Sequence, residues 1–181
     1  PGFPVELEQE IFEITAVQCP SSIPRLMLVA RRVKKWVEPL LYQTIFISPF
    51  SGRVEGIPPF TADIILRTLR TKPHGFFQRS VHRLYMDRKF SGMDNILQAC
   101  TGIGELFLGF GISADARLLS AMSNLRRLTV QIDLMFDGRP VDFTHPAFRN
   151  LTHLEILDRA ADRATGTWAG VRSIPGLTHV A

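Results

Sequence analysis

A short apolar pattern, LxxLxL, recurs in this chain from residue 81 onwards at nearly constant intervals. Its copies are Val81, Leu84 and Met86; Ile103, Leu106 and Leu108; Leu125, Leu128 and Val130; Leu151, Leu154 and Ile156; and, cut off by the chain end, Leu177 and Val180. Successive copies begin 22, 22, 26 and 26 residues apart. A unit of this length holds one short strand and one helical segment, and it cannot bury its apolar face alone. The copies must therefore stack and share one elongated core.

The interval lies in the range of leucine-rich repeats, about 20–29 residues. The sequence therefore predicts an α/β fold in which residues 81–181 form an irregular leucine-rich-repeat solenoid with a parallel sheet. The asparagine or cysteine that usually follows the last strand leucine is replaced by Lys89, Gly111, Asp133 and Arg159, which favours an irregular arc. The chain stops inside the fifth, truncated unit. We expect either a fragment of a longer repeat protein or an open edge that meets a partner.

The residues between and beside the apolar positions form a second predicted set. Strand side chains alternate between the two faces of a sheet, so these residues should point to the concave surface. They are Arg83, Tyr85, Glu105, Phe107, Arg127, Thr129, His153, Glu155 and His179, flanked by Asp87, Gly109, Gln131 and Leu157. Tyrosine, phenylalanine and arginine are residue types that often anchor interfaces. The set predicts a surface that binds a protein, and the alternative is a row of ordinary solvated strand residues.

The N-terminal region has a helical pattern. Leu7, Ile11 and Ile14 follow the spacing i, i+4, i+7, with glutamates on the opposite side, which predicts an amphipathic helix of roughly twelve residues. A second helix is predicted from the apolar positions Leu26, Val29, Val33, Trp36 and Leu40. Pro39 should bend or end it near Val37 or Glu38.

The segment between these helices and residue 81 predicts three elements. Residues 42–47 match the repeat pattern and predict an atypical first strand, because terminal repeats of a stack differ from the others. Residues 48–59 are rich in proline, glycine and serine and predict a surface loop. Residues 61–69 predict a helix that returns the chain to the first repeat.

Several short motifs occur in a fixed order ahead of the repeats. They are Phe3-Pro4-Val5-Glu6-Leu7, Ile11-Phe12, Leu26 to Arg32, and then Trp36, Pro39, Leu40, Tyr42 and Ile45. This arrangement resembles F-box proteins with leucine-rich repeats, whose box carries Leu-Pro-x-Glu-Leu, Ile-Phe and Leu-x-x-Val-x-Arg. The resemblance implies an F-box-like region at 1–47, a linking loop and helix at 48–80, and repeats at 81–181.

In that family the box docks on a Skp-type adaptor of a cullin-RING ubiquitin ligase, and the repeats hold the protein to be ubiquitinated. The resemblance therefore implies adaptor contacts for a set of N-terminal side chains, some of which will face the helices' own core. They are Phe3, Pro4, Ile11, Phe12, Leu26 and Val29. It also implies a protein substrate for the repeats.

Two departures from the family pattern leave an alternative open. The connector from Cys19 to Pro24 is short, and Val33 stands where the family often has tryptophan. The alternative is a free-standing leucine-rich-repeat scaffold whose degenerate box only caps the solenoid. In that case Phe3, Ile11, Phe12 and Trp36 would pack against the first repeat.

Composition and charge exclude several other classes of protein. The net charge of +4 comes from dispersed residues. The one dense basic cluster is interpreted as the solvent-exposed face of a helix and consists of Arg31, Arg32, Lys34 and Lys35. We therefore expect no nucleic-acid partner. No apolar run reaches the ~20 residues of a membrane span, so no membrane is expected either. Cys19 and Cys100 match no metal spacing and should be reduced thiols, which favours the cytoplasm or nucleus.

A catalytic or metal site is not expected. His153, Glu155 and His179 would be neighbours on adjacent strands and form a possible metal-binding set, but the repetition of Leu-Thr-His explains the two histidines more simply. Gly102-Ile103-Gly104 lacks the third glycine of a dinucleotide fingerprint and precedes a strand. The sequence therefore predicts no enzyme, no metal and no cofactor.

Overall fold

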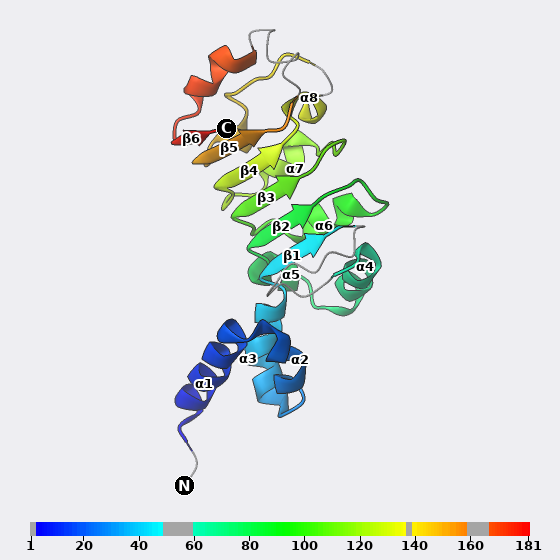
Figure 1. Ribbon diagram of the computed structural model, residues 1–181, viewed down its shortest axis with the longest axis vertical. Helices are drawn as coiled ribbons and strands as arrows, with labels where there is room; N and C mark the ends of the chain where they lie inside the picture. Colours follow the sequence, from blue (N-terminus) through cyan, green and yellow to red (C-terminus); the bar gives the residue numbers. More distant parts are fainter. Residues whose placement is uncertain (1–2, 49–59, 137–138, 159–166) are drawn as a thin grey trace.

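The computed structural model of the protein describes residues 3–48, 60–136, 139–158 and 167–181, without the side chains of residues 167–169. The fold is mixed α/β: a group of N-terminal helices stands at one end of a parallel sheet (Figure 1). The predicted loop at 48–59, apart from its first residue, and Arg159 lie outside the described residues.

Six short strands form one parallel sheet. They are β1 (Thr44–Ile47), β2 (Arg83–Met86), β3 (Glu105–Leu108), β4 (Arg127–Val130), β5 (His153–Ile156) and β6 (His179–Val180). Each strand pairs with the next one in the chain, in the order β1 to β6. Leu84, Leu106, Leu128 and Leu154 are register partners across the strands. The prediction that equivalent repeat positions lie side by side is confirmed. A strand is also present within the predicted residues 42–47, and it spans Thr44–Ile47.

The expected arc is not seen, because the sheet is not curled (Figure 1). Curvature in a stack of repeats arises when each unit adds the same small rotation. Here the segments after the strands differ from unit to unit, so no constant rotation accumulates.

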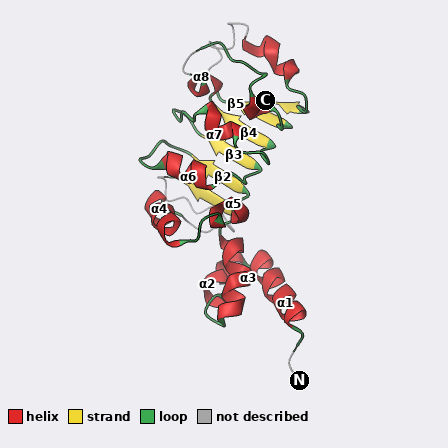
Figure 2. Ribbon diagram, turned by 180° about the vertical axis from the view of Figure 1, so that it is seen from behind, coloured by secondary structure: helices red, strands yellow, loops and turns green. Residues whose placement is uncertain are grey.

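The connecting segments lie along one face of the sheet (Figure 2). They are α4 (Ala62–Thr71), α5 (Phe76–Ser80), α6 (Met93–Ala99), α7 (Ala116–Ser120), α8 (Ile132–Met135), η2 (Pro146–Phe148) and η4 (Thr167–Ser173). The helix predicted at 61–69 is α4, and Thr61 caps it by accepting a hydrogen bond at Oγ1 from the amide of Ile64, 3.3 Å away.

The core fills the space between the sheet and these segments. The three apolar positions of each of the first four repeat copies are buried, as predicted. Phe148 of η2 is fully buried and packs against Phe136 and Phe143, with ring centroids 6.0 and 5.5 Å apart. In the fifth copy Leu177 is half-buried and Val180 is exposed, because no further described unit covers β6.

Two glycines lie where backbones approach each other closely. A Cβ on Gly102 would collide with the carbonyl oxygen of Gln78 in α5, and one on Gly109 would collide with that of Asp87. Packing between neighbouring units therefore requires glycine at both positions.

The N-terminal helices form a small unit with its own core. They are α1 (Val5–Gln18), η1 (Pro20–Ser22), α2 (Ile23–Leu26) and α3 (Arg31–Leu41), around buried Ala16, Ile23, Val33 and Val37. We refer to them as the helical unit. The basic residues Arg31, Arg32, Lys34 and Lys35 are exposed on α3, as interpreted from the sequence.

Two details of the predicted second helix are wrong. The expected helix is two helices, because the backbone of Ala30 is extended (φ −159°, ψ 156°) and separates α2 from α3. Pro39 does not end α3, which continues to Leu41. Pro39 removes one backbone hydrogen bond from the last turn of α3. Burial of Val33 and Val37 on the same helix favours the helix and offsets this loss.

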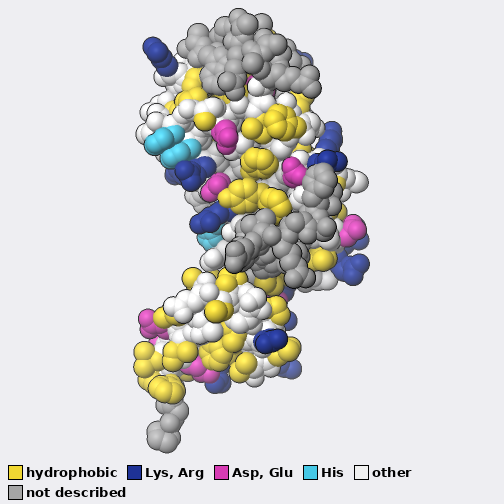
Figure 3. Space-filling view, in the orientation of Figure 1, with side chains coloured by type: hydrophobic (Ala, Val, Ile, Leu, Met, Phe, Trp, Pro, Cys, Tyr) yellow, Lys and Arg dark blue, Asp and Glu magenta, His cyan; other side chains and the backbone are white. Residues whose placement is uncertain are grey.

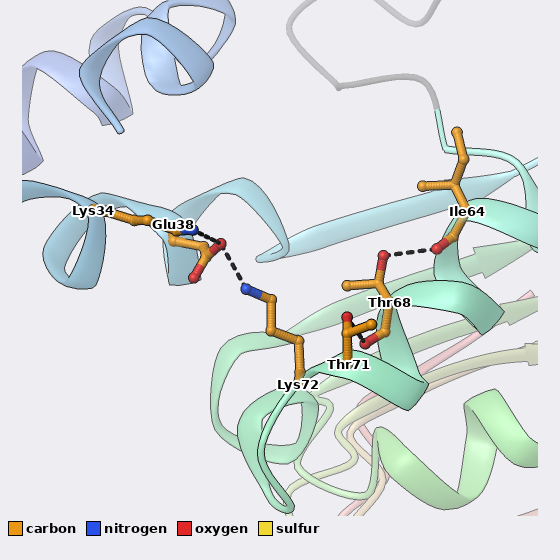
Figure 4. A network of polar contacts seen from close by, with 6 residues as sticks. All are labelled: Lys34, Glu38, Ile64, Thr68, Thr71 and Lys72. Carbon is orange, nitrogen blue, oxygen red and sulfur yellow. Dashed lines mark hydrogen bonds and ion pairs between the residues drawn. The ribbon is translucent and has the colours of Figure 1, made fainter. Parts of the chain in front are cut away.

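The helical unit meets the sheet through a narrow joint. Glu38 of α3 forms an ion pair with Lys72, 2.6 Å away, and a longer one with Lys34, 3.8 Å away (Figure 4). Next to it, the Tyr42 ring packs against Phe60, Phe76 and Phe77, with centroids 5.4 to 5.6 Å apart. Within the described residues, no helix has the length and apolarity needed to cross a membrane.

Candidate functional site

The first helix directs an apolar stripe away from the rest of the protein. Leu7, Ile11 and Ile14 are 48%, 53% and 47% exposed. The opposite side of α1 packs against α3 through Phe12 and Ala16. The predicted apolar periodicity is therefore present, but the stripe it defines is not the face that the helical unit buries. We refer to Phe3, Leu7, Ile11 and Ile14 as the α1 stripe.

An ion pair also links this helix to α3. The guanidinium of Arg32 on α3 donates to both carboxylate oxygens of Glu8 on α1, at 2.8 and 3.0 Å. Glu8 also raises the pKa of Arg32 through this hydrogen bond and its charge. Both residues line a shallow hollow of about 460 Å³ together with Phe3, Ile11 and Phe12. The hollow therefore borders the stripe and is lined by two aromatic side chains.

The six predicted adaptor residues fall into two groups. Phe3, Pro4, Ile11 and Val29 are exposed. Phe12 and Leu26 are half-buried and pack against the core of the helical unit. Phe3 and Ile11 are therefore available to a partner, while Phe12 and Leu26 also have a structural role.

The sequence interpretation missed exposed apolar side chains of the helical unit, among them Val17 and Leu28. Leu28, next to Val29, is 85% exposed. It lies in the turn between α2 and α3, where helical periodicity gives no signal.

The second candidate surface is the face of the sheet opposite the connecting segments. All nine residues predicted to point there lie on this face, in two rows across the strands. The first row is Thr44, Arg83, Glu105, Arg127, His153 and His179, and the second is Phe46, Tyr85, Phe107, Thr129 and Glu155. We refer to these rows together as the open sheet face, which Figure 3 shows from the front.

Aromatic rings occupy one end of the second row. The centroids of Phe46 and Tyr85 are 6.3 Å apart, and those of Tyr85 and Phe107 are also 6.3 Å apart. All three side chains are half-buried. Phe46 was not in the predicted set, although its strand was predicted, because it precedes the first regular repeat.

Tyr85 joins the two rows. Its hydroxyl donates to Oε1 of Glu105 at 2.8 Å. Burial of the ring raises the pKa of Tyr85 to about 12, helped by the Glu105 carboxylate and opposed by Arg83 and Arg127. Tyr85 therefore stays a neutral hydrogen-bond donor at physiological pH and holds Glu105 in place.

Two histidines stack at the other end of the first row. The rings of His153 and His179 are nearly parallel, with centroids 4.2 Å apart. Their Nδ1 atoms lie 2.9 and 2.8 Å from the hydroxyls of Thr152 and Thr178. Partial burial lowers the pKa of His153, as do the charges of Arg127 and His179.

Glu155, the acidic member of the metal set that was considered and not expected, is engaged elsewhere. Glu155 Oε2 accepts a hydrogen bond from the hydroxyl of Thr129 at 3.0 Å. Among the described residues, no three histidine, cysteine, aspartate or glutamate side chains are grouped so that they could hold a metal ion. Cys100 is buried, which raises the pKa of its thiol to about 12, and Cys19 is exposed. What the open sheet face presents is an array of hydrogen-bonding, charged and aromatic groups suited to binding.

Comparison with known proteins adds no assignment: no family model, no curated protein and no solved structure matches this chain.

Proposed function

We propose that this protein is a protein–protein interaction module with two separate surfaces. The helical unit acts as an F-box-like region that docks on a Skp-type adaptor of a cullin-RING ubiquitin ligase. The strands and connecting segments act as an irregular leucine-rich-repeat stack whose open sheet face holds the protein to be ubiquitinated. The chain has no catalytic role of its own in this proposal.

The observation that carries the proposal is the outward orientation of the α1 stripe. Exposed apolar side chains gathered on one helix face mark interaction sites in soluble proteins. The helical unit needs none of these four side chains for its core, which is built from Ala16, Ile23, Val33 and Val37. A partner that covers the α1 stripe would explain why these apolar side chains are exposed in the chain alone.

The sheet supports the second half of the proposal. Four copies of the apolar pattern occupy equivalent buried positions on parallel neighbouring strands. Among the described residues, no connecting segment packs on the other face of these strands, and aromatic and arginine side chains are half-buried or exposed there. Aromatic and arginine side chains are enriched among residues that dominate interface energetics.

The test is co-expression with a Skp-type adaptor followed by size-exclusion chromatography. The parent chain is expected to co-elute with the adaptor, and the double variant Ile11→Asp with Val29→Asp is expected to elute alone. Both side chains are exposed, so the charges should leave folding intact. Changing Phe12 or Leu26 would be less informative, because these residues pack in the helical core.

A control places one new negative charge, against two in the double variant, on an exposed apolar residue outside the helical unit. Phe110, which follows β3, is 68% exposed, and Phe110→Asp should retain the adaptor. Retention of the adaptor by the Ile11 and Val29 double variant would refute docking through the α1 stripe.

The second candidate function is a free-standing scaffold with a degenerate box. It is favoured by Val33, which is fully buried in the helical core where the family often has tryptophan. One part of that alternative does not fit the structure: Phe3 and Ile11 are exposed, and Phe12 and Trp36 pack in the helical core and not against the first strand. A scaffold of this kind would show no adaptor complex at any concentration of the parent chain.

A further inference from the structure

We propose that the open sheet face binds an acidic protein segment that carries an aromatic or large aliphatic side chain. This inference rests on the proposed function only in that the same face is taken to bind a protein. It adds the chemistry of the bound segment.

The first argument is a basic margin along the N-terminal ends of the strands. The residues there are His82, Arg83, Arg126, Arg127, His153 and His179, with Glu105 as the acidic exception. Arg83, Arg126 and Arg127 are exposed. Figure 3 shows blue and cyan side chains along this margin of the sheet.

The arginines of this margin have no carboxylate partner within the described part of the chain. The ion pairs of Arg32 with Glu8, and of Lys34 and Lys72 with Glu38, lie in or beside the helical unit and involve none of these arginines. Glu105 is directed to the Tyr85 hydroxyl. The guanidiniums of Arg83 and Arg127 are therefore free to bind carboxylates of a partner, which they can do bidentately.

The second argument is the aromatic row beside this margin. Tyr85 and Phe107 are half-buried neighbours, so a ring or aliphatic group laid on them would remove apolar surface of both the ligand and the protein from water. Glu105 and Glu155 lie on the same face. Their charges disfavour a continuous polyanion such as nucleic acid, whereas a peptide can place its carboxylates only where the arginines are.

The geometry also limits the spacing of the acidic residues. Arg83 and Arg127 lie on β2 and β4, two strands apart, which is about 9.6 Å in a sheet. A polyproline-II segment brings residues i and i+3 to the same side at about 9.3 Å. Two glutamates three residues apart, in a segment crossing the strands, would therefore reach both arginines.

The test uses a labelled peptide with the core Glu-Pro-Phe-Glu between glycine-serine ends, measured by fluorescence anisotropy at low ionic strength. The matched probe has glutamine in place of both glutamates. We expect the glutamate peptide to bind at least about tenfold more tightly, and added salt to remove this advantage, because the difference is electrostatic.

Variants locate the binding site. Arg83→Glu with Arg127→Glu should remove the preference for the glutamate peptide. The control Lys89→Glu with Arg117→Glu makes the same change in net charge at exposed residues lining a hollow on the helix side, and should keep it. Phe107→Ala should weaken both peptides and leave their ratio unchanged.

A glutamate peptide that binds no more tightly than the glutamine peptide would overturn this inference, as would an unchanged preference in the Arg83 and Arg127 variant. Neither result bears on adaptor docking. If the adaptor co-elutes and the peptide preference is absent, the proposed function stands and the acidic ligand is wrong. If the peptide preference is present and no adaptor binds, the acidic ligand stands and adaptor docking is wrong.

Discussion

Tyr85 shows how a single residue organises the open sheet face. Its hydroxyl holds the Glu105 carboxylate, and its ring lies between Phe46 and Phe107. Without this hydrogen bond Glu105 would be free to swing toward Arg83 or Arg127, its partners in register. The tyrosine therefore keeps the arginines unpaired.

The first prediction concerns the acidity of this tyrosine. Glu105→Gln should lower the pKa of Tyr85 from about 12, because the carboxylate charge that opposes tyrosinate is lost. Burial of the ring remains, so the value should stay above the ordinary 10. The chain has two tyrosines, so ultraviolet titration of tyrosinate in a Tyr42→Phe background reports Tyr85 alone.

The control for this titration is Glu155→Gln. That carboxylate accepts from Thr129 and does not touch Tyr85, so its loss should leave the Tyr85 pKa almost unchanged. An equal pKa in the parent and in Glu105→Gln would contradict the role given to Glu105.

The second prediction concerns the stacked histidines. The pKa of His153 lies below 6.5 in the folded protein. Between that lowered value and 6.5 the unfolded chain binds more protons at this position, so the contribution of His153 to stability is present above pH 6.5. It is lost as the pH falls toward the folded pKa. The ring C–H resonances, followed by NMR against pH, give the folded value directly.

A neutral side chain at position 179 tests the cause of this shift. His179→Gln removes a neighbouring positive charge, so the pKa of His153 should rise toward 6.5, while burial and Arg127 still hold it below that value. His82→Gln is the matched control, because His82 bonds to the Ser80 carbonyl and does not stack on His153. A His153 pKa that is unmoved by His179→Gln would show that the stacked ring contributes nothing to it.

At the scale of elements, close packing between neighbouring units makes a third prediction. Gly102 precedes β3, and its Cα approaches the Gln78 carbonyl of α5 so closely that no Cβ fits. Gly102→Ala should lower the free energy of unfolding by about 1–3 kcal/mol, the usual cost of overpacking a rigid site. Urea denaturation followed by circular dichroism measures the change.

Gly104 provides the comparison two residues later. A Cβ there would meet its nearest atoms at 3.7 and 3.9 Å, which is ordinary contact. Gly104→Ala should therefore be close to neutral. If both alanine variants were equally stable, the close approach of α5 would not explain the glycine at 102.

The strands were predictable because each combines a strong apolar signal with a fixed interval. Register could be read from Leu84, Leu106, Leu128 and Leu154 directly, since stacked units must align equivalent positions. The break between α2 and α3 was not predictable in this way. Leu26, Val29 and Val33 keep helical spacing, yet the extended backbone at Ala30 interrupts the helix. Apolar spacing does not show where a single residue leaves the helical conformation.

The candidate site was predictable where it depends on alternation along a strand. All nine predicted residues point to the open sheet face because strand side chains must alternate. The orientation of α1 was not predictable. Its sequence offers two apolar sides, one with Ile11 and one with Phe12 and Ala16, and tertiary packing against α3 decides which of them is buried.

The whole molecule consists of two cores joined at one place. The helical core and the sheet core share only the half-buried Leu41 among the described residues. The joint itself is the Glu38–Lys72 ion pair, in which both side chains are largely buried, and the rings around Tyr42. The α1 stripe and the open sheet face therefore lie on different sides of this joint.

The last prediction tests that joint. Glu38→Gln removes the carboxylate and leaves the Lys72 ammonium without its partner, so the free energy of unfolding should fall by about 1–3 kcal/mol. The two cores should also lose part of their coupling. In a Trp168→Phe background, Trp36 fluorescence reports the helical unit, because Trp36 packs against its core, while circular dichroism reports the whole chain.

In the parent protein we expect the two signals to change together during urea denaturation. In Glu38→Gln the Trp36 transition should come first, because the helical core is small and relies on the joint for support. Lys34→Met is the control: that exposed lysine lies 3.8 Å from Glu38, four residues away on the same helix, a pair worth about 0–1 kcal/mol. Coincident transitions in Glu38→Gln would mean that the Tyr42 ring cluster alone suffices to couple the two cores.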